Sequence, residues 1–303
     1  MNKEVELFIE DIKRIVSPVP ERRALELFST FIAATTKALE DVVSEDVVSG
    51  VLTSIARIMA KEMWPSLGEP KGLNELLKAI MERFPAKFEK YVTDDSIVVR
   101  TCPIRDIVER ENLKLGGMLC TFTKGFFWYM LQKAVDPKAK IVRMAPGYYG
   151  CLCTFKNVKV EDVPKYEYSY EEYLEKVQTY MEVLLKGLLS TFQKLLGDVA
   201  KGYLVNAGRF AGYAHGSIFP LVEDPSLAIK MVNAYLTLWE GEVKLGEGAW
   251  ILEEKKYEIP YIKDEMFCNL FYGYISGLLS AALGKDVQFD NYGCSEKKVM
   301  KLE

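Results

Sequence analysis

The sequence predicts an α+β protein that contains two copies of one unit. Segments with helical periodicity and segments rich in β-branched residues occur in runs rather than in strict alternation, which is typical of α+β proteins with antiparallel sheets. Short patterns also recur in the same order about 140–160 residues apart. We therefore expect copy 1 at 20–156, a charged, tyrosine-rich linker at 157–172 and copy 2 at 173–303, packed as an intrachain pseudo-dimer.

The repeat is visible first in the helices. Residues 27–31 (LFSTF) recur as 188–192 (LLSTF), each inside a helical pattern. A helix over 70–84 matches a helix over 225–239, and each begins with a proline, which the first turn of a helix tolerates because its N–H groups have no partner within the helix. The same order of elements is therefore expected in both copies.

The repeat continues through a cysteine followed, after four residues, by a glycine and an aromatic residue. Cys120 precedes Gly125 in copy 1, and Cys268 precedes Gly273 in copy 2. Both glycines open an apolar helical stretch, over 126–135 and 274–283. If the copies share a fold, the two cysteines and the two glycines occupy equivalent positions.

The strands are predicted from β-branched runs bounded by turn residues. We expect strands at 96–102, 140–145 and 151–156 in copy 1, and at 242–245, 250–254, 286–290 and 298–302 in copy 2. The sequence PGYYG at 146–150 is typical of a turn between two strands.

Composition excludes several classes of protein. The chain has 303 residues, of which 49% are hydrophobic and 12% aromatic, so it is neither disordered nor fibrous. Its 39 basic residues against 43 acidic ones give a net charge of −4, and we expect no nucleic-acid partner. The single histidine, His215, excludes a His-rich zinc centre and is expected to be a hydrogen-bonded polar residue rather than a base.

The N-terminal segment is charged throughout, which predicts no signal peptide, and the longest apolar runs are expected to be too short for a membrane span. These features predict a cytoplasmic protein with reduced cysteines. Abundant Glu and Lys with only four Gln resemble proteins of thermophiles, in which disulfides inside the cell are less exceptional. We also expect that the chain can form a homodimer.

The Cys-x4-Gly-aromatic pattern, followed by a late cysteine-bearing strand, resembles the 4-vinyl-reductase domain, also called the predicted hydrocarbon-binding domain. The segment NAGRFAGY at 206–213 is similar to a glycine-bearing helix of that family. The resemblance implies a fold related to nitric-oxide-sensor and TRAPP-type ligand-binding domains. It also implies a cytoplasmic protein that binds a hydrophobic molecule between helices and sheet.

The resemblance further implies a metal site built on the helix-opening cysteine and later cysteines. In copy 1 the matching residues are Cys120 and the strand pair Cys151 and Cys153, with Cys102 as a replacement fourth ligand. In copy 2 only Cys268 and Cys294 match, because the acidic position falls on Asn291.

The chemistry of the copy 1 cysteines leaves two interpretations open. Four cysteines without histidine suit zinc or an iron–sulfur cluster, and alternate residues of a strand point to one face. Against this, C-x-C chelates less often than C-x-x-C, and free cysteines are commonly buried apolar residues. We therefore expect either a metal site or four core thiols.

A ligand pocket is predicted from dense aromatic runs that a single helix face cannot accommodate. The candidate ligand-binding residues are Phe126, Trp128, Tyr129, Tyr148, Phe271, Tyr274, Gly208 and Gly212. For the aromatic residues the alternative is core packing, and for the glycines it is close packing of a neighbouring helix.

Three functions remain from the sequence. The favoured one is a binding protein for a small hydrophobic or aromatic molecule. The first alternative is a metal- or cysteine-dependent redox enzyme acting on that molecule, although the sequence contains no G-x-G-x-x-G and no P-loop. The second alternative is a protein-interaction scaffold.

Overall fold

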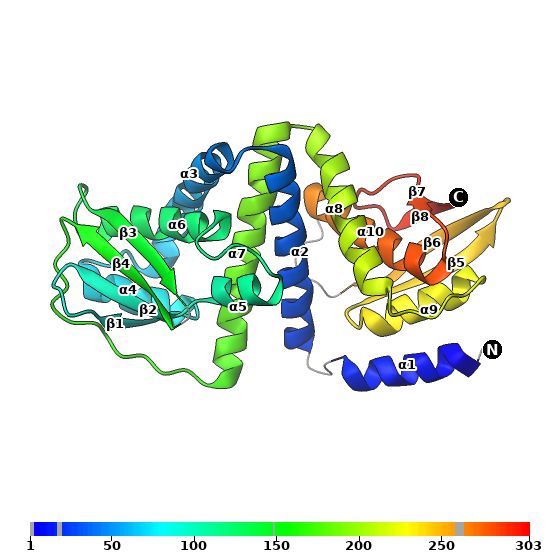
Figure 1. Cartoon of the computed structure of the whole chain (residues 1–303), viewed down its shortest axis with the longest axis horizontal. Helices are drawn as coiled ribbons and strands as arrows, with labels where there is room; N and C mark the ends of the chain where they lie inside the picture. Colours follow the sequence, from blue (N-terminus) through cyan, green and yellow to red (C-terminus); the bar gives the residue numbers. More distant parts are fainter. Residues whose placement is uncertain (1–2, 17–19, 148, 258–263) are drawn as a thin grey trace. The chain divides into compact units, whose positions relative to one another are not determined.

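The computed structural model describes residues 3–16, 20–147, 149–257 and 264–303. Within these ranges the chain forms ten α-helices and two separate four-stranded antiparallel sheets, which confirms the α+β class (Figure 1). The chain divides into two compact units. Unit 1 consists of Met1–Ala38 with Phe192–Glu303, and unit 2 consists of Leu39–Thr191.

Unit 2 contains most of α7 (Tyr170–Leu196) and the complete elements α3 (Glu45–Met63), η1 (Trp64–Leu67), α4 (Leu73–Arg83), β1 (Lys87–Lys90), β2 (Ser96–Thr101), α5 (Pro103–Arg110), α6 (Met118–Ala134), β3 (Lys140–Gly147) and β4 (Gly150–Lys156). Unit 1 contains most of α2 (Pro20–Val42) and the complete elements α1 (Lys3–Ile15), α8 (Val199–Gly216), α9 (Pro225–Tyr235), β5 (Trp239–Gly246), β6 (Ala249–Tyr257), α10 (Glu265–Leu283), β7 (Val287–Phe289) and β8 (Lys297–Leu302).

The two sheets have the same topology. Their strand orders are β1-β2-β4-β3 and β5-β6-β8-β7, so in each unit the fourth strand lies between the second and the third. The seven strands expected from β-branched runs are present within a few residues of their predicted bounds. The short strand β1 was not predicted, because its sequence KFEK is charged and lacks a β-branched run.

The long helices are exchanged with respect to the predicted copies. Most of α2, which precedes the αβ elements of unit 2 in sequence, belongs to unit 1, and most of α7 belongs to unit 2. The segment 157–169 has no regular secondary structure and lies within unit 2 rather than at a unit boundary. The compact units therefore have boundaries different from the predicted copies 20–156 and 173–303.

Each exchanged helix supplies a buried cation to the end of a shorter helix. In unit 1, Arg23 of α2 donates to the carbonyl of Tyr235 at the end of α9, with an N–O distance of 2.6 Å. In unit 2, Lys176 of α7 donates to the carbonyls of Met81 and Glu82 at the end of α4. Cations at helix C-termini satisfy carbonyls that lack an intrahelical partner. The two units thus share this contact as well as their strand order.

Unit 1 is built on a close helix pair, α8 and α10. A Cβ added at Gly208 would lie 2.1 Å from the carbonyl oxygen of Leu270, and one added at Gly212 would lie 2.0 Å from that of Tyr274. The relation is reciprocal, since a Cβ at Gly273 would lie 2.3 Å from the carbonyl oxygen of Val205. These glycines therefore allow the two helix backbones to touch. This agrees with the alternative expected for Gly208 and Gly212, the close packing of a neighbouring helix.

Unit 2 uses the corresponding pair, α3 and α6, less tightly. A Cβ at Gly125 of α6 would lie 2.8 Å from the carbonyl oxygen of Thr53, whereas one at Gly50 of α3 would have no neighbour within 4 Å. Gly125 thus faces α3 and Gly273 faces α8, each within its own unit. Cys120 lies in the first turn of α6 and Cys268 in the first turn of α10.

The apolar helix α10 corrects the expectation that no segment is long enough to span a membrane. Within the described part of the chain, its residues Glu265–Leu283 are long and apolar enough to cross one by length and composition. The whole of its most apolar window is buried inside the structure, as in the core helix of a soluble protein.

Candidate functional site

Unit 2 contains an apolar cavity between its sheet and its helices. The space available to the centres of water-sized molecules is about 100 Å³. The cavity wall is formed by one face of the sheet, by helices α4, α5, α6 and α7, and by the loops joining them. Its lining includes Ile80, Phe84, Phe88, Val99, Ile104, Leu115, Phe126, Phe127, Met144, Pro146 and Tyr180.

Four free cysteines also line this cavity: Cys102, Cys120, Cys151 and Cys153. Cys102 directly precedes α5, Cys120 lies in the first turn of α6, and the other two lie on β4. In the sheet Cys151 pairs with Val99 and Cys153 with Met144, and the alternation of side chains along β4 places both thiols on the cavity face. The structure therefore brings together the four copy 1 cysteines that the sequence singled out.

The donor chemistry of four thiols suits zinc or an iron–sulfur cluster, but their arrangement does not supply a ready site. Among the described residues, no group of three or more His, Cys, Asp or Glu side chains is placed to hold a metal ion. The metal site consequently stays a prediction, and no step below uses a metal.

The four thiols have different environments. Burial raises the pKa of Cys102, and burial likewise raises the pKa of Cys120 to about 11. The pKa of Cys151 is lowered, mainly because the thiol of Cys153 donates a hydrogen bond to its sulfur and also because Arg105 lies nearby. The pKa of Cys153 is raised in return, because its proton is held by Cys151. Of the four, Cys151 is the one whose thiol pKa is shifted downward.

A few polar groups interrupt the apolar wall. Thr123 of α6 and Tyr180 of α7 share a hydrogen bond of 2.6 Å between their hydroxyl oxygens, and burial raises the pKa of Tyr180 well above its ordinary value. Arg105 and Lys124 also line the cavity. Sequence reasoning missed Tyr180 because α7 was assigned to the other copy, so nothing in its local pattern linked it to the copy 1 cysteines.

The predicted aromatic residues of copy 1 divide between two environments. Phe126 lines the cavity and is buried. Trp128 instead donates from Nε1 to the carbonyl of Ala139 at 2.8 Å and lies under the guanidinium of Arg57. Tyr129 lies beside the ammonium group of Lys133. The structure thus does not place Trp128 and Tyr129 at the cavity, and Tyr148 lies outside the described residues.

The predicted ligand-binding residues of copy 2 lie in the core of unit 1. Phe271 and Tyr274 are fully buried and both contact the ring of Phe31 edge-on. His215 Nδ1 is 2.7 Å from the hydroxyl oxygen of Tyr274, so this histidine has a polar partner, as expected. Gly208 and Gly212 pack against the backbone of α10. None of these residues lines the unit 2 cavity.

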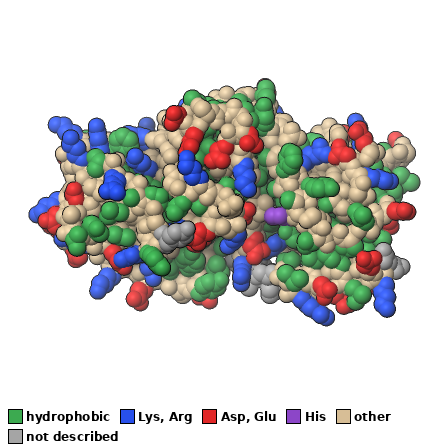
Figure 2. Space-filling model, in the orientation of Figure 1, with side chains coloured by type: hydrophobic (Ala, Val, Ile, Leu, Met, Phe, Trp, Pro, Cys, Tyr) green, Lys and Arg blue, Asp and Glu red, His purple; other side chains and the backbone are tan. Residues whose placement is uncertain are grey.

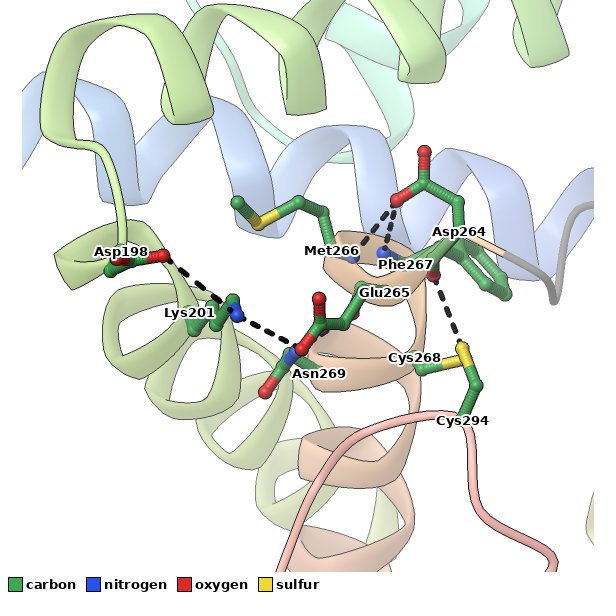
Figure 3. Close-up of polar contacts among 9 residues, drawn as sticks. All are labelled: Asp198, Lys201, Asp264, Glu265, Met266, Phe267, Cys268, Asn269 and Cys294. Carbon is green, nitrogen blue, oxygen red and sulfur yellow. Dashed lines mark hydrogen bonds and ion pairs between the residues drawn. A yellow bond between two sulfur atoms is a disulfide. The ribbon is translucent and has the colours of Figure 1, made fainter.

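Cys268 and Cys294 form a disulfide, which corrects their assignment as metal ligands. A disulfide sulfur lacks the thiolate that binds a metal. Figure 3 shows the bond joining α10 to the loop before β8, near the ion pair of Lys201 with Glu265 (2.9 Å). The carboxylate of Asp264 accepts hydrogen bonds from the first backbone amides of α10 and thereby caps this helix end.

The surface carries mixed charge. On the face shown in Figure 2, acidic and basic side chains are interspersed rather than separated into two patches. This distribution agrees with the nearly balanced totals of the sequence.

Comparisons with protein-family models, with curated proteins and with solved structures found no match to this chain.

Proposed function

We propose that this protein binds a small hydrophobic molecule in the cavity of unit 2. The observation that carries the proposal is an apolar space between helices and sheet in which aliphatic side chains, aromatic rings and four thiols form most of the wall. Protein interiors are otherwise packed closely, so an apolar space of this kind is a common place for a ligand.

The wall also indicates the character of the ligand. Aromatic and aliphatic side chains favour an apolar body, because each buried methylene contributes about 0.8 kcal/mol to binding. Arg105 and Lys124 can interact with a carbonyl or carboxylate at one end, whereas a ligand with many polar groups would lose hydrogen bonds with water. The proposed ligand is therefore a small, mainly apolar molecule with at most one polar end.

A cavity-filling substitution tests the proposal. Val99 lines the cavity, and its neighbour Val98 points to the opposite face of β2, so Val99→Trp and Val98→Trp form a matched pair. Native mass spectrometry of the purified protein, and titration with the fluorescent probe 1-anilinonaphthalene-8-sulfonate, measure occupancy. We expect Val99→Trp to lose binding while Val98→Trp retains it. Equal binding by both folded variants would contradict the proposal.

We also propose that the two units are copies of one α+β unit related to the 4-vinyl-reductase domain, paired as an intrachain pseudo-dimer. Support comes from the common strand order, the buried cation on each exchanged helix and the first-turn positions of Cys120 in α6 and Cys268 in α10. An experimental structure in which the two sheets superpose without aligning these cysteines would contradict it. The cytoplasmic location and the homodimer stay predictions.

A further inference from the structure

The polar side chains of the unit 2 cavity include two cations and no acidic group. Apart from the four thiols, the polar side chains that line the cavity are those of Thr101, Arg105, Thr123, Lys124 and Tyr180. In the part of the chain that the structure describes, no Asp, Glu, Asn, Gln or His lines this cavity. The electrostatic potential at the wall is therefore positive, which favours an anionic ligand and disfavours a cationic one.

The two cations are half-buried, and neither forms an ion pair with a carboxylate among the described residues. Arg105 donates to an uncharged acceptor, the carbonyl of Arg100, with an N–O distance of 3.2 Å. The acidic residue next to it in the sequence, Asp106, accepts a hydrogen bond from the hydroxyl of Tyr173. Cations that have lost part of their hydration are usually paired with an anion, because an unpaired charge is costly in an apolar environment. A negative group on the ligand would supply this missing partner for Arg105 and Lys124.

A pair of hydroxyl groups provides a further hydrogen-bond donor. The hydroxyl oxygens of Thr123 and Tyr180 lie 2.6 Å apart, and only 9% of the surface of Tyr180 is exposed. Two hydroxyl groups carry two hydrogens, and the bond between them uses one. Neither hydroxyl has another hydrogen bond within the described ranges, so one O–H group of the pair remains without an acceptor. In an apolar wall such a group is stabilised by a ligand that offers an acceptor.

We propose that the unit 2 cavity binds a monocarboxylate with an apolar body, whose carboxylate group lies against Arg105 and Lys124. An ionised carboxylate is negative and only accepts hydrogen bonds, so it matches two cations and a remaining hydroxyl donor. An alcohol brings a donor of its own, and an amine brings a like charge. The inference rests on the proposed hydrophobic-ligand function and names the chemical class of ligand for the same site. Binding forms and breaks no covalent bond.

The experiment compares three probes that have the same linear carbon chain and different polar ends: octanoate, 1-octanol and octylamine. Isothermal titration calorimetry with the full-length protein at neutral pH gives the dissociation constant of each probe. Because the apolar chain is the same, differences between the probes report on the polar end. We expect the wild-type protein to bind octanoate at least about tenfold more tightly than octylamine and about threefold more tightly than 1-octanol.

Substitution of the cations separates their role in binding from a structural one. Lys124→Met and Arg105→Met should each weaken octanoate binding at least about fivefold while the affinity for 1-octanol changes less than about twofold. Lys133→Met is the matched control, because it removes the same charge from an exposed position of the same helix and should keep the octanoate affinity. Arg105→Lys keeps the charge and should bind octanoate more tightly than Arg105→Met does. Circular dichroism checks that each variant is folded, and Lys124→Met decides the test if Arg105→Met does not fold.

Two results would overturn the inference: equal affinity of the wild-type protein for octanoate and 1-octanol, or an octanoate preference that is unchanged in folded Lys124→Met and Arg105→Met. Binding of 1-octanol separates this failure from failure of the proposed function. If 1-octanol binds to wild type and to Val98→Trp but not to Val99→Trp, while octanoate has no advantage, the cavity binds hydrophobic molecules without a carboxylate site. If neither 1-octanol nor octanoate binds to wild type, the proposed function fails as well.

Discussion

Units 1 and 2 share one strand order, yet side chains fill the space beside helix α10 of unit 1 and helix α6 of unit 2 differently. In unit 1 the rings of Phe31, Phe267 and Phe271 are buried and packed edge-on or stacked against one another, and Trp239 adds a further ring. In unit 2 the corresponding region contains a cavity lined by four thiols. The topology therefore does not determine whether the interior is closed; the volumes of a few side chains do.

The cysteines follow the same division. In unit 1 Cys268, in the first turn of α10, is joined to Cys294 in the loop before β8. In unit 2 Cys120, in the first turn of α6, is a free thiol beside the cavity. Unit 1 thus contains a disulfide and closely packed rings, whereas unit 2 contains free thiols at a cavity. Four measurements test this difference.

The largest expected effect is at the α8–α10 contact. Gly212→Leu should destabilise the protein by about 4–5 kcal/mol or more, because its Cβ would lie 2.0 Å from a backbone oxygen that has no room to move. Gly50→Ala in the corresponding helix of unit 2 meets no atom within 4 Å and should gain up to about 1 kcal/mol from helix propensity. Urea unfolding measures both, and similar losses in the two variants would remove the proposed contrast.

Removal of an aromatic ring should cost more in unit 1 than in unit 2. Phe271→Ala should lose about 3–5 kcal/mol, since its fully buried ring leaves a new hole in a filled core. Phe126→Ala should lose about 1–2 kcal/mol less, because that ring lies against an existing cavity that its neighbours can partly close. The free energy of unfolding in urea gives both values, and a greater loss for Phe126→Ala would reverse the comparison.

The disulfide should account for the next largest effect. Reduction of the Cys268–Cys294 bond, which closes a loop with a sequence separation of 26, should lower stability by about 2–4 kcal/mol. Unfolding with and without dithiothreitol measures this loss. Cys294→Ser should abolish the dependence on reductant, whereas Cys120→Ser in unit 2 should retain it. A wild-type protein insensitive to dithiothreitol would show that the bond is not formed.

The smallest effect concerns the buried Lys298 of unit 1, whose ammonium donates to the carbonyls of Gly293 and Ser295. Burial lowers the pKa of Lys298 to about 8. Between pH 8 and the ordinary lysine pKa near 10.5, Lys298 holds fewer protons in the folded state than in the unfolded state. The free energy of unfolding therefore rises with pH across this range, by a total on the order of 2 kcal/mol.

This rise is best measured between pH 8 and about 9.5, below the ordinary pKa of tyrosine. Burial raises the pKa of the neighbouring Tyr272, which makes stability fall again at higher pH. Lys298→Met should lack the rise in this window while Lys301→Met, an exposed neighbour on the same strand, keeps it. A wild-type stability that falls from pH 8 to 9.5 would contradict the assignment.

The order of elements could be predicted from the sequence, because β-branched runs and helical periodicity are local properties. The exchange of α2 and α7 could not be predicted, because it depends on which surfaces far apart in the sequence pack best. Phe31 of α2, which packs against Phe267 of α10, is an example. The helix over 70–84 was expected to begin at Pro70, but Gly72 precedes its first turn and α4 begins at Leu73.

The candidate site could be predicted in part. The grouping of Cys102, Cys120, Cys151 and Cys153 was expected from the resemblance to the 4-vinyl-reductase domain, and the structure gathers the four cysteines at one cavity. For Cys268 and Cys294 the sequence pattern does not distinguish metal ligands from a disulfide, because both need only two nearby sulfurs. The run from Phe126 to Tyr129 could not be divided by composition alone, since the helical period turns Trp128 away from the cavity.

The exchange of helices also has a consequence for synthesis on the ribosome. Unit 2 is a continuous stretch, Leu39–Thr191, and can fold as soon as it has emerged. Helix α2 is made before that stretch, but the ring of Phe31 finds its partners Phe267, Phe271 and Tyr274 only when the last third of the chain appears. During that interval the apolar face of α2 lacks these partners, so the nascent chain exposes this face until residues 192–283 have been made.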